Sequence, residues 1–299
     1  MSLFYSDVFT LPLPPGHPFP VGKYPRLRER LLASGLFDER DFRVAEPVGD
    51  ADIGRVHCTQ YLSRVVSGSL DARELRAIGL PWSERLVERS RRSAGATLAA
   101  AREALVKGWS ANLGGGTHHA FRDRGSGYCV LNDAAIAARA MQAEAGLQRI
   151  AIVDCDVHQG NGTAALFAGD DSVFTFSMHA AKNFPARKER SDLDIELEDG
   201  TGDDEYLWHL ERGLDETLER SRPQLAFYLA GADPYEDDRL GRLKLTKRGL
   251  QRRDEHVLST LAARGIPVAV TMAGGYARDL DDVAVIHTAT LVAARRVES

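Results

Sequence analysis

Residues 152–162 read IVDCDVHQGNG, an apolar run that stops at Asp154, Asp156 and His158 and is followed by glycine. Alternate side chains of an extended strand share a face, so Asp156 and His158 project together, with Asp154 on the same side one step earlier. Carboxylate and imidazole donors suit zinc or a similar divalent ion, and a catalytic zinc commonly has three protein ligands. The segment therefore predicts a buried strand ending at a metal site that lacks one ligand. An isolated pair of this kind is more often an ordinary strand end, so other segments have to support this reading.

Similar apolar runs recur at residues 150–155, 172–178, 225–231 and 267–275. Each ends in polar or glycine residues, which is the pattern of buried parallel strands. Stretches with helical period lie between and around these runs, at residues 81–107, 131–145, 203–220, 246–264 and 279–297. Strands that alternate with helices predict an α/β fold, with a central parallel sheet flanked by helices on both faces and a site outside the carboxyl ends of the strands. No repeat or linker divides the chain, so we predict a single domain over residues 1–299.

The composition is that of an ordinary globular protein, with 299 residues, 43% hydrophobic and 27% charged. A formal net charge of -5 gives the whole chain no attraction to nucleic acid or to an anionic membrane. We find neither a signal-peptide pattern nor an apolar stretch long enough to span a membrane, and we expect a cytoplasmic location. The three cysteines lack metal-site spacing and are expected to be reduced. The first 80 residues are proline-rich and irregular, with a helix expected over residues 26–33.

Three other predicted strand ends carry polar groups. His118 and His119 follow a run of three glycines, Asp233 comes directly after an apolar run, and Tyr276 follows a double glycine. Each of these could be an ordinary loop residue or helix cap if it stood alone. Together they supply a third metal ligand, two imidazoles for proton transfer and a phenol that can stabilise an oxyanion. This set predicts metal-assisted hydrolysis, in which the ion lowers the pKa of bound water and a neutral histidine accepts its proton.

The motifs GGGTHHA, DCDVHQGNGT, GADPYEDD and AGGY, in this order, resemble those of the zinc-dependent histone deacetylase family. That family includes acetylpolyamine amidohydrolases and acetoin-utilisation proteins. The resemblance implies the arginase/deacetylase fold and one zinc ion held by Asp156, His158 and Asp233. It also implies hydrolysis of an acylated amine, typically N-acetyl-lysine.

The same resemblance implies roles for the residues around the metal. His119 is the better match for the general base and His118 for its electrostatic partner, although which of them donates the final proton stays open. Asp154 is expected to orient His118, and Tyr276 to stabilise the transition state. Asn161 stands where some members have a second aspartate, which makes the chain resemble class II or IV. Its short length and its opening HPFPVGK favour a class IV-like branch.

Substrate contacts and potassium sites are also implied. Gly127, Tyr128 and Phe184 would line a narrow tunnel for the acyl-lysine stem, and Gly274 and Gly275 would lie beside the substrate. A first potassium site would be formed by Asp154, Asp156, His158, Ser177 and Met178, and a second by Phe167, Asp170 and Val173. The basic residue of the product-exit channel would be Lys23 or Arg26. A rim aspartate that grips the substrate backbone is not identified, and the segment around Trp82 is where we expect to find it.

The substrate is left open between acyl-lysine in proteins or peptides, a small acetylated amine of the polyamine type, and a long-chain acyl-lysine. Oligomeric state is also open. An acid-rich stretch at residues 192–205 would attract cationic substrates if it lay at the rim, but a solvated loop is the more common role of such a run. A binuclear manganese ureohydrolase is disfavoured because Gly160 stands where it needs another carboxylate. A non-catalytic acyl-lysine binder is disfavoured because binding does not require Tyr276 or both histidines.

Overall fold

The computed structural model describes residues 2–297. Its centre is a parallel eight-stranded sheet with the strand order β2-β1-β3-β8-β7-β4-β5-β6. The strands are β1 (Leu3–Tyr5), β2 (Phe42–Val44), β3 (Trp109–Asn112), β4 (Ile150–Asp154), β5 (Val173–Ala180), β6 (Leu193–Leu197), β7 (Leu225–Leu229) and β8 (Val268–Thr271).

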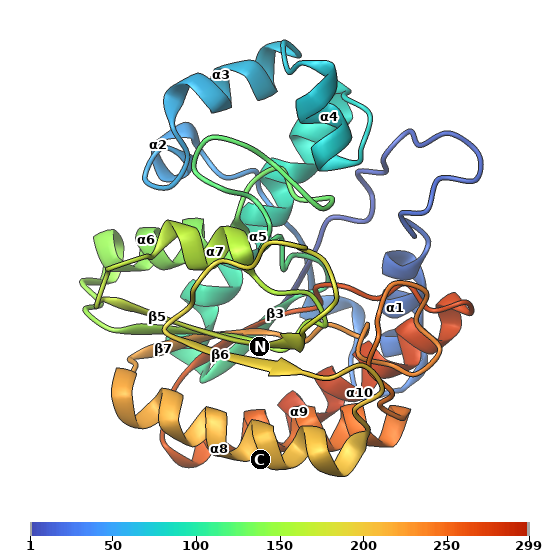
Figure 1. Cartoon of the computed structure of the whole chain (residues 1–299), viewed down its shortest axis with the longest axis vertical. Helices are drawn as coiled ribbons and strands as arrows, with labels where there is room; N and C mark the ends of the chain where they lie inside the picture. The colour runs from blue at the N-terminus through green and yellow to red at the C-terminus, as the bar shows by residue number, and fades with distance from the viewer. Residues whose placement is uncertain (1, 298–299) are drawn as a thin grey trace.

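Helices cover both faces of this sheet (Figure 1). Helices α5, α6 and α7 lie on one side, α8, α9 and α10 lie on the other, and α1 packs against α10. The helices are α1 (Lys23–Ala33), α2 (Asp50–Ile53), α3 (Thr59–Ser67), α4 (Ala72–Ile78), α5 (Glu84–Lys107), α6 (Asp133–Ala145), α7 (Asn161–Leu166), α8 (Asp203–Ser221), α9 (Lys247–Ala263) and α10 (Leu280–Arg296), with a short 3-10 turn at Glu39–Asp41.

The apolar character of the central strands follows from this layering. Along β4, Ile150 and Ile152 enter the hydrophobic cluster on one face, whereas Ala151 and Val153 enter the cluster on the other. All four side chains are buried. Burying one such aliphatic side chain is worth ~1.5–3 kcal/mol, so a strand with water on one face would not favour an unbroken apolar run.

The predicted α/β fold is confirmed. The four predicted strands correspond to β4, β5, β7 and β8, and the five long helical stretches to α5, α6, α8, α9 and α10, with small shifts at the ends. The helix expected over residues 26–33 begins earlier, at Lys23. The description of the first 80 residues was incomplete, because they also contain β1, β2, α2, α3 and α4. Three-residue strands such as β1 and β2 are too short to produce a periodic pattern.

Strand register brings the predicted site residues to one edge of the sheet. Asp154 at the end of β4 pairs with Leu229 of β7, which in turn pairs with Thr271 of β8. Because these three strands are parallel neighbours, the segments that follow them start side by side. Among the described helices, none combines the length and the apolar character needed to cross a membrane.

Candidate active site

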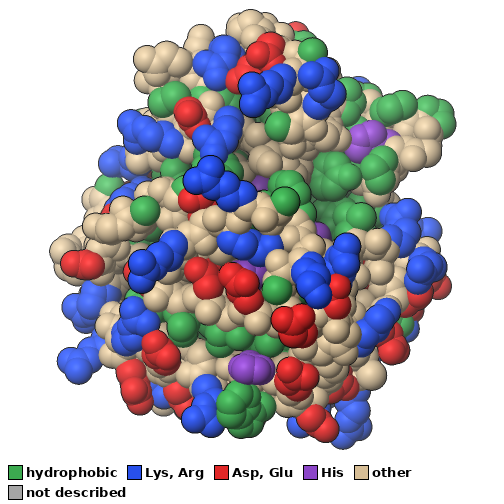
Figure 2. All heavy atoms as spheres, viewed as in Figure 1, with side chains coloured by type: hydrophobic (Ala, Val, Ile, Leu, Met, Phe, Trp, Pro, Cys, Tyr) green, Lys and Arg blue, Asp and Glu red, His purple; other side chains and the backbone are tan. Residues whose placement is uncertain are grey.

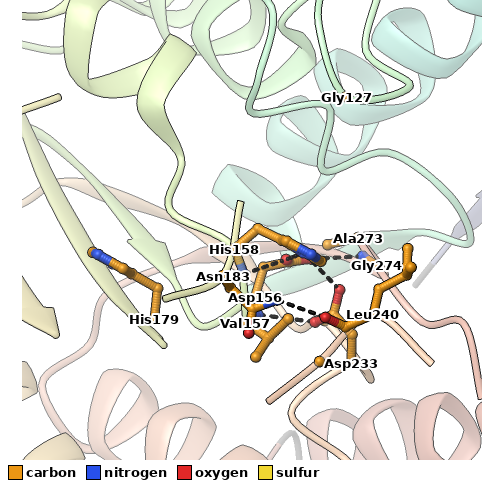
Figure 3. A network of polar contacts seen from close by, with 12 residues as sticks. Gly127, Asp156, Val157, His158, His179, Asn183, Asp233, Leu240, Ala273 and Gly274 are labelled. Carbon is orange, nitrogen blue, oxygen red and sulfur yellow. Dashed lines mark hydrogen bonds and ion pairs between the residues drawn. The ribbon is translucent and has the colours of Figure 1, made fainter. Parts of the chain in front are cut away.

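The site begins with three buried side chains at the ends of β4 and β7 (Figure 3). His158 Nδ1 lies 3.0 Å from Asp156 Oδ1 and 3.2 Å from Asp233 Oδ2. The carboxylates are fixed by backbone amides, since Gly274 N donates to Asp156 Oδ2 at 2.8 Å and Val157 N donates to Asp233 Oδ1 at 2.9 Å. The three predicted metal ligands are therefore adjacent and held by the backbone of neighbouring strand ends.

These donors fit a tetrahedral divalent ion. Ligands at ~2.0–2.1 Å from zinc in a tetrahedron are about 3.3 Å apart, close to the separations around His158 Nδ1. This nitrogen carries at most one proton, and Asp233 Oδ2 is left buried without a hydrogen-bond partner. Burial and the Asp156 carboxylate raise the pKa of Asp233 to about 7. A bound cation would relieve the repulsion between these two carboxylates.

Glycine makes room for this cluster. A Cβ atom on Gly274 would lie 1.9 Å from Asp233 Oδ2 and 2.5 Å from Asp156 Oδ2. A Cβ atom on Gly160 would lie 2.4 Å from Asp154 Oδ2. The space beside the carboxylates is therefore free of side chains at these two positions.

The tandem histidines are held by two different acceptors. His118 Nδ1 and Asp154 Oδ2 are 2.6 Å apart, whereas His119 Nδ1 and Asn161 Oδ1 are 2.7 Å apart. An amide or carboxylate oxygen accepts, so in each pair Nδ1–H is the donor and Nε2 is left for other contacts. Both imidazoles are buried, with ring centroids 4.1 Å apart.

The two rings have opposite electrostatic environments. Although burial alone would lower the pKa of His118, the carboxylates of Asp154 and Asp156 raise it to about 9. Burial and the neighbouring imidazoles of His118 and His158 lower the pKa of His119 well below its usual value. One ring thus favours the charged form and the other the neutral form.

A cavity of about 470 Å³ opens onto this cluster. Gly127, Tyr128, Phe184, Gly274 and Tyr276 all line it, as does each of the tandem histidines. Gly127 lies between two rings, because a Cβ atom there would be 2.5 Å from His119 Cδ2 and 3.0 Å from Phe184 Cε1. Phe184 is 44% exposed, so its ring reaches from the buried histidine toward solvent.

Tyr276 lies in the segment after β8, and its ring centre is 5.9 Å from that of Tyr128. Its backbone N donates to Asp238 Oδ2 at 2.6 Å, and its carbonyl accepts from Arg239 Nε at 3.0 Å. Burial, Asp233 and Asp156 raise the pKa of the phenol well above its usual value. The hydroxyl therefore remains a hydrogen-bond donor at neutral pH.

Of the two predicted basic residues near the cavity, only Lys23 lines it. Its side chain is buried, and Nζ donates to the carbonyls of Ala273 at 3.0 Å and Gly275 at 3.5 Å. The same atom lies 5.4 Å from the centre of the Tyr276 ring. Arg26 instead pairs with Asp281 at 3.0 Å, and both side chains are well exposed.

The segment around Trp82, where we expected the rim aspartate, contributes no carboxylate to the cavity lining, so this residue stays unidentified. Trp82 donates to the Val65 carbonyl and packs over Gly68, away from the cavity. The part of this region that lines the cavity is Arg76 to Gly79, at the end of α4, and it contains no carboxylate. Gly127 N and Tyr128 N bond to the carbonyls of Ala77 and Ile78, so the tunnel wall is anchored to this turn.

Two buried carboxylates with supporting contacts were missed. Asp133 accepts from Gly116 N, Thr117 N and the Thr117 hydroxyl, and so fixes the glycine turn before the histidines. Asp238 holds the Tyr276 amide. Asp133 opens the helix α6, so its only sequence signal was that of an ordinary helix start.

The potassium sites remain predictions. Ser177 Oγ contacts His179 Nδ1 at 3.0 Å, and the carbonyls of Phe167 and Asp170 accept from the amides of Asp170 and Val173. Met178 lies in the middle of β5, and its side chain is buried. None of these contacts is evidence for a bound cation.

A family model described as the histone deacetylase domain matches residues 17–292. An uncharacterized protein of Picosynechococcus is 44% identical and covers 98% of each chain. A histone deacetylase-like amidohydrolase of Pseudomonas aeruginosa is 33% identical over 74% of this chain and 62% of its own. Among solved structures, a histone deacetylase homolog from Aquifex aeolicus covers 98% of this chain and 84% of its own with a TM-score of 0.83, at 22% identity. The structural likeness shows that the two proteins share a fold. Because the family model matches residues 17–292, the chain belongs to the histone deacetylase family.

Proposed function

We propose that this protein is a zinc-dependent amidohydrolase that removes an acyl group, in the first instance acetyl, from a lysine side chain or a related acylated amine. The observation that carries this proposal is the group of three metal donors at the inner end of a cavity, beside two histidines with separate acceptors. We also propose that the whole chain forms one catalytic domain.

Asp156, His158 and Asp233 would hold the zinc ion. When bound there, zinc supplies an acidified water molecule and polarises the carbonyl of the acyl group. A second metal in the manner of a ureohydrolase is disfavoured, because a carboxylate at position 160 would collide with Asp154. The donor set therefore supports a single catalytic ion.

His119 is the proposed general base. Its Nδ1–H is committed to Asn161 Oδ1, which leaves the Nε2 lone pair free to take a proton. The amide of Asn161 fixes the ring and its tautomer without adding a charge. His118, held by Asp154, would provide a positive charge that stabilises the negative charge developing in the transition state.

Tyr276 and the tunnel complete the machinery. The phenol would donate a hydrogen bond to the negative charge that develops on the carbonyl oxygen of the acyl group, which its protonated state at neutral pH allows. Tyr128 and Phe184 would hold an extended polymethylene stem between them, with Gly127 leaving room for it. Lys23, next to Tyr276, would hold the released carboxylate product.

Metal-stripped full-length protein, reloaded with zinc, tests this proposal on acetyl-lysine peptides, acetylated polyamines and long-chain acyl-lysine. We expect one zinc per chain and turnover of at least one acylated amine, both lost in Asp233→Asn. Asp237→Asn removes a neighbouring exposed carboxylate and serves as the matched control. One zinc per chain without turnover of any substrate would overturn the catalytic proposal, and two manganese ions per chain would favour a ureohydrolase.

A further inference from the structure

The mouth of the cavity has an unusual balance of charge. Arg76, Lys182 and Arg242 line it, in addition to the buried Lys23. The carboxylates among the lining residues are Asp156 and Asp233, which are the proposed metal ligands at the inner end. Every other ionisable side chain that the described part of the chain contributes to the lining, apart from histidines, tyrosines and a cysteine, is thus a cation.

The carboxylates that pair with these cations do not line the cavity. Lys182 pairs with Glu198 at 3.6 Å and Arg242 pairs with Asp199 at 3.0 Å, yet neither carboxylate lines the cavity. Arg76 forms no ion pair with any residue between positions 2 and 297. Two of the three cations are therefore partly balanced by carboxylates outside the cavity lining, whereas Arg76 is not.

The backbone around these cations is well fixed. Asn183 Oδ1 accepts from Arg242 N at 3.0 Å, and Asn183 Nδ2 donates to the Leu240 carbonyl at 2.6 Å. This joins the loop of Lys182 and Phe184 to the loop of Arg242. On the third side, Arg76 directly precedes Ala77, whose carbonyl accepts from Gly127 N. The three cations are consequently attached to the same segments that form the tunnel wall.

The acid-rich stretch at residues 192–205 reaches the mouth through Glu198 and Asp199, the ion-pair partners of Lys182 and Arg242. Asp192 accepts from Thr175, Asp194 accepts from Gln159, and Asp203 accepts from Thr246. None of the acidic residues of this stretch lines the cavity. On the molecular face drawn in Figure 2, basic and acidic side chains are mixed without a large area of one sign.

We propose that the mouth selects acylated amines that carry a negative charge at the outer end of the stem, such as an acyl-lysine whose carboxylate is free. This inference rests on the proposed function and names its substrate class. A carboxylate about one lysine stem away from the acyl group would lie among three cations, where water screens but does not abolish the attraction. A polyamine places an ammonium at the same point and is repelled.

Three substrates that share one acyl group and one stem test the proposal: Nα,Nε-diacetyl-lysine, its carboxamide, and N-acetylcadaverine. At low ionic strength we expect kcat/KM to fall from the acid to the amide by about threefold to tenfold, and again from the amide to the amine. The preference shrinks at high salt. Arg76→Glu brings the ratio of acid to amide close to one.

Arg73→Glu is the matched control, because Arg73 lies on the same exposed helix and does not line the cavity, so its ratio should resemble that of the unaltered chain. A ratio of acid to amide at or below one in the unaltered chain overturns the inference and leaves the proposed function intact. Calorimetry measures the affinity for the same compounds independently of turnover. Equal affinity for the acid and the amide overturns the inference. No turnover of these three compounds by a chain that turns over acetyl-lysine peptides also overturns the inference, whereas no turnover of any acylated amine overturns the proposed function.

Discussion

Arg253 Nη1 donates a 2.6 Å hydrogen bond to the carbonyl oxygen of Gly231. The same nitrogen donates to the carbonyl of Cys155 at 3.2 Å, so one guanidinium joins the ends of β4 and β7. Cys155 immediately precedes Asp156, and Gly231 comes shortly before Asp233. Arg253 is completely buried, and its charge is balanced by Asp254 at 2.8 Å. A buried cation behind the site therefore fixes the spacing of two proposed metal ligands.

Replacing this cation should weaken both stability and zinc binding. Arg253→Met leaves Asp254 buried without its partner and removes donors from two carbonyls, which costs ~3–5 kcal/mol of unfolding free energy. We also expect zinc affinity to fall about 10–100-fold, the usual effect of losing a group that positions metal ligands. Denaturant unfolding and a competitive chelator titration measure these two quantities.

Arg252→Met is the control for this change. Arg252 is the preceding residue on the same helix, and its exposed pair with Asp204 at 3.3 Å should contribute less than about 1 kcal/mol. If Arg253→Met is no less stable than Arg252→Met and binds zinc equally well, Arg253 does not position the site. Arg253→Lys keeps the charge without the planar fork, and we expect an intermediate loss.

The parts of the site that were predictable are those with a strong local pattern. Asp156 and His158 were expected on one face of an extended strand; they lie instead in the bends directly after β4, where their side chains still meet. The apolar runs before Asp233 and Tyr276 identified two further strand ends. Because neighbouring parallel strands end at the same edge of a sheet, the predicted fold class implied that the residues after these strands lie close together. Arg253 could not be found in this way, since it lies within an ordinary helical stretch and reaches the site only through tertiary packing.

The mouth was unpredictable for a related reason. Arg76, Lys182 and Arg242 come from three segments far apart in the sequence, and each is an unremarkable surface cation in its local context. The segment around Trp82 was expected to carry the rim aspartate, but the indole of Trp82 packs over Gly68. Only the three-dimensional arrangement reveals which loops surround the cavity.

Gly274→Ala should separate metal binding from folding. The backbone of Gly274 lies outside the left-handed region, so alanine is tolerated by the main chain. Its Cβ, however, would lie 1.9 Å from Asp233 Oδ2 and force this carboxylate to move. We expect zinc content well below one per chain with the circular dichroism spectrum retained. Gly49→Ala, where a Cβ meets nothing within 4 Å, is the control, and full zinc occupancy in Gly274→Ala would contradict the proposed ligand set.

Asn161→Leu tests how His119 is held. The change removes the acceptor of the His119 Nδ1 proton and leaves a buried donor unpaired. We expect kcat to fall about 10–100-fold with little change in KM, because the ring loses its fixed orientation rather than its substrate contacts. Gln142→Leu, which removes an amide bonded to Ser172 away from the cavity, controls for the loss of an amide. An unchanged kcat in Asn161→Leu would show that His119 needs no such support.

His57 should make the folded chain sensitive to acid. Its Nδ1 bonds to the Phe121 carbonyl and its Nε2 accepts from Asn132 N, so the ring is buried in the neutral form. Burial lowers its pKa to about 4.

In the unfolded chain a histidine binds its proton below about pH 6.5, so between these values the unfolded state holds more protons and stability falls as pH falls. The full difference approaches ~3 kcal/mol and no longer grows below about pH 4. Comparing the unfolding free energies of the unaltered chain and His57→Gln from pH 7 to 4 isolates this contribution, since their carboxylates are the same. His57→Gln should be less stable at pH 7, and the gap should narrow steadily below pH 6.5. A gap that stays constant with pH would mean that His57 titrates equally in the folded and unfolded states.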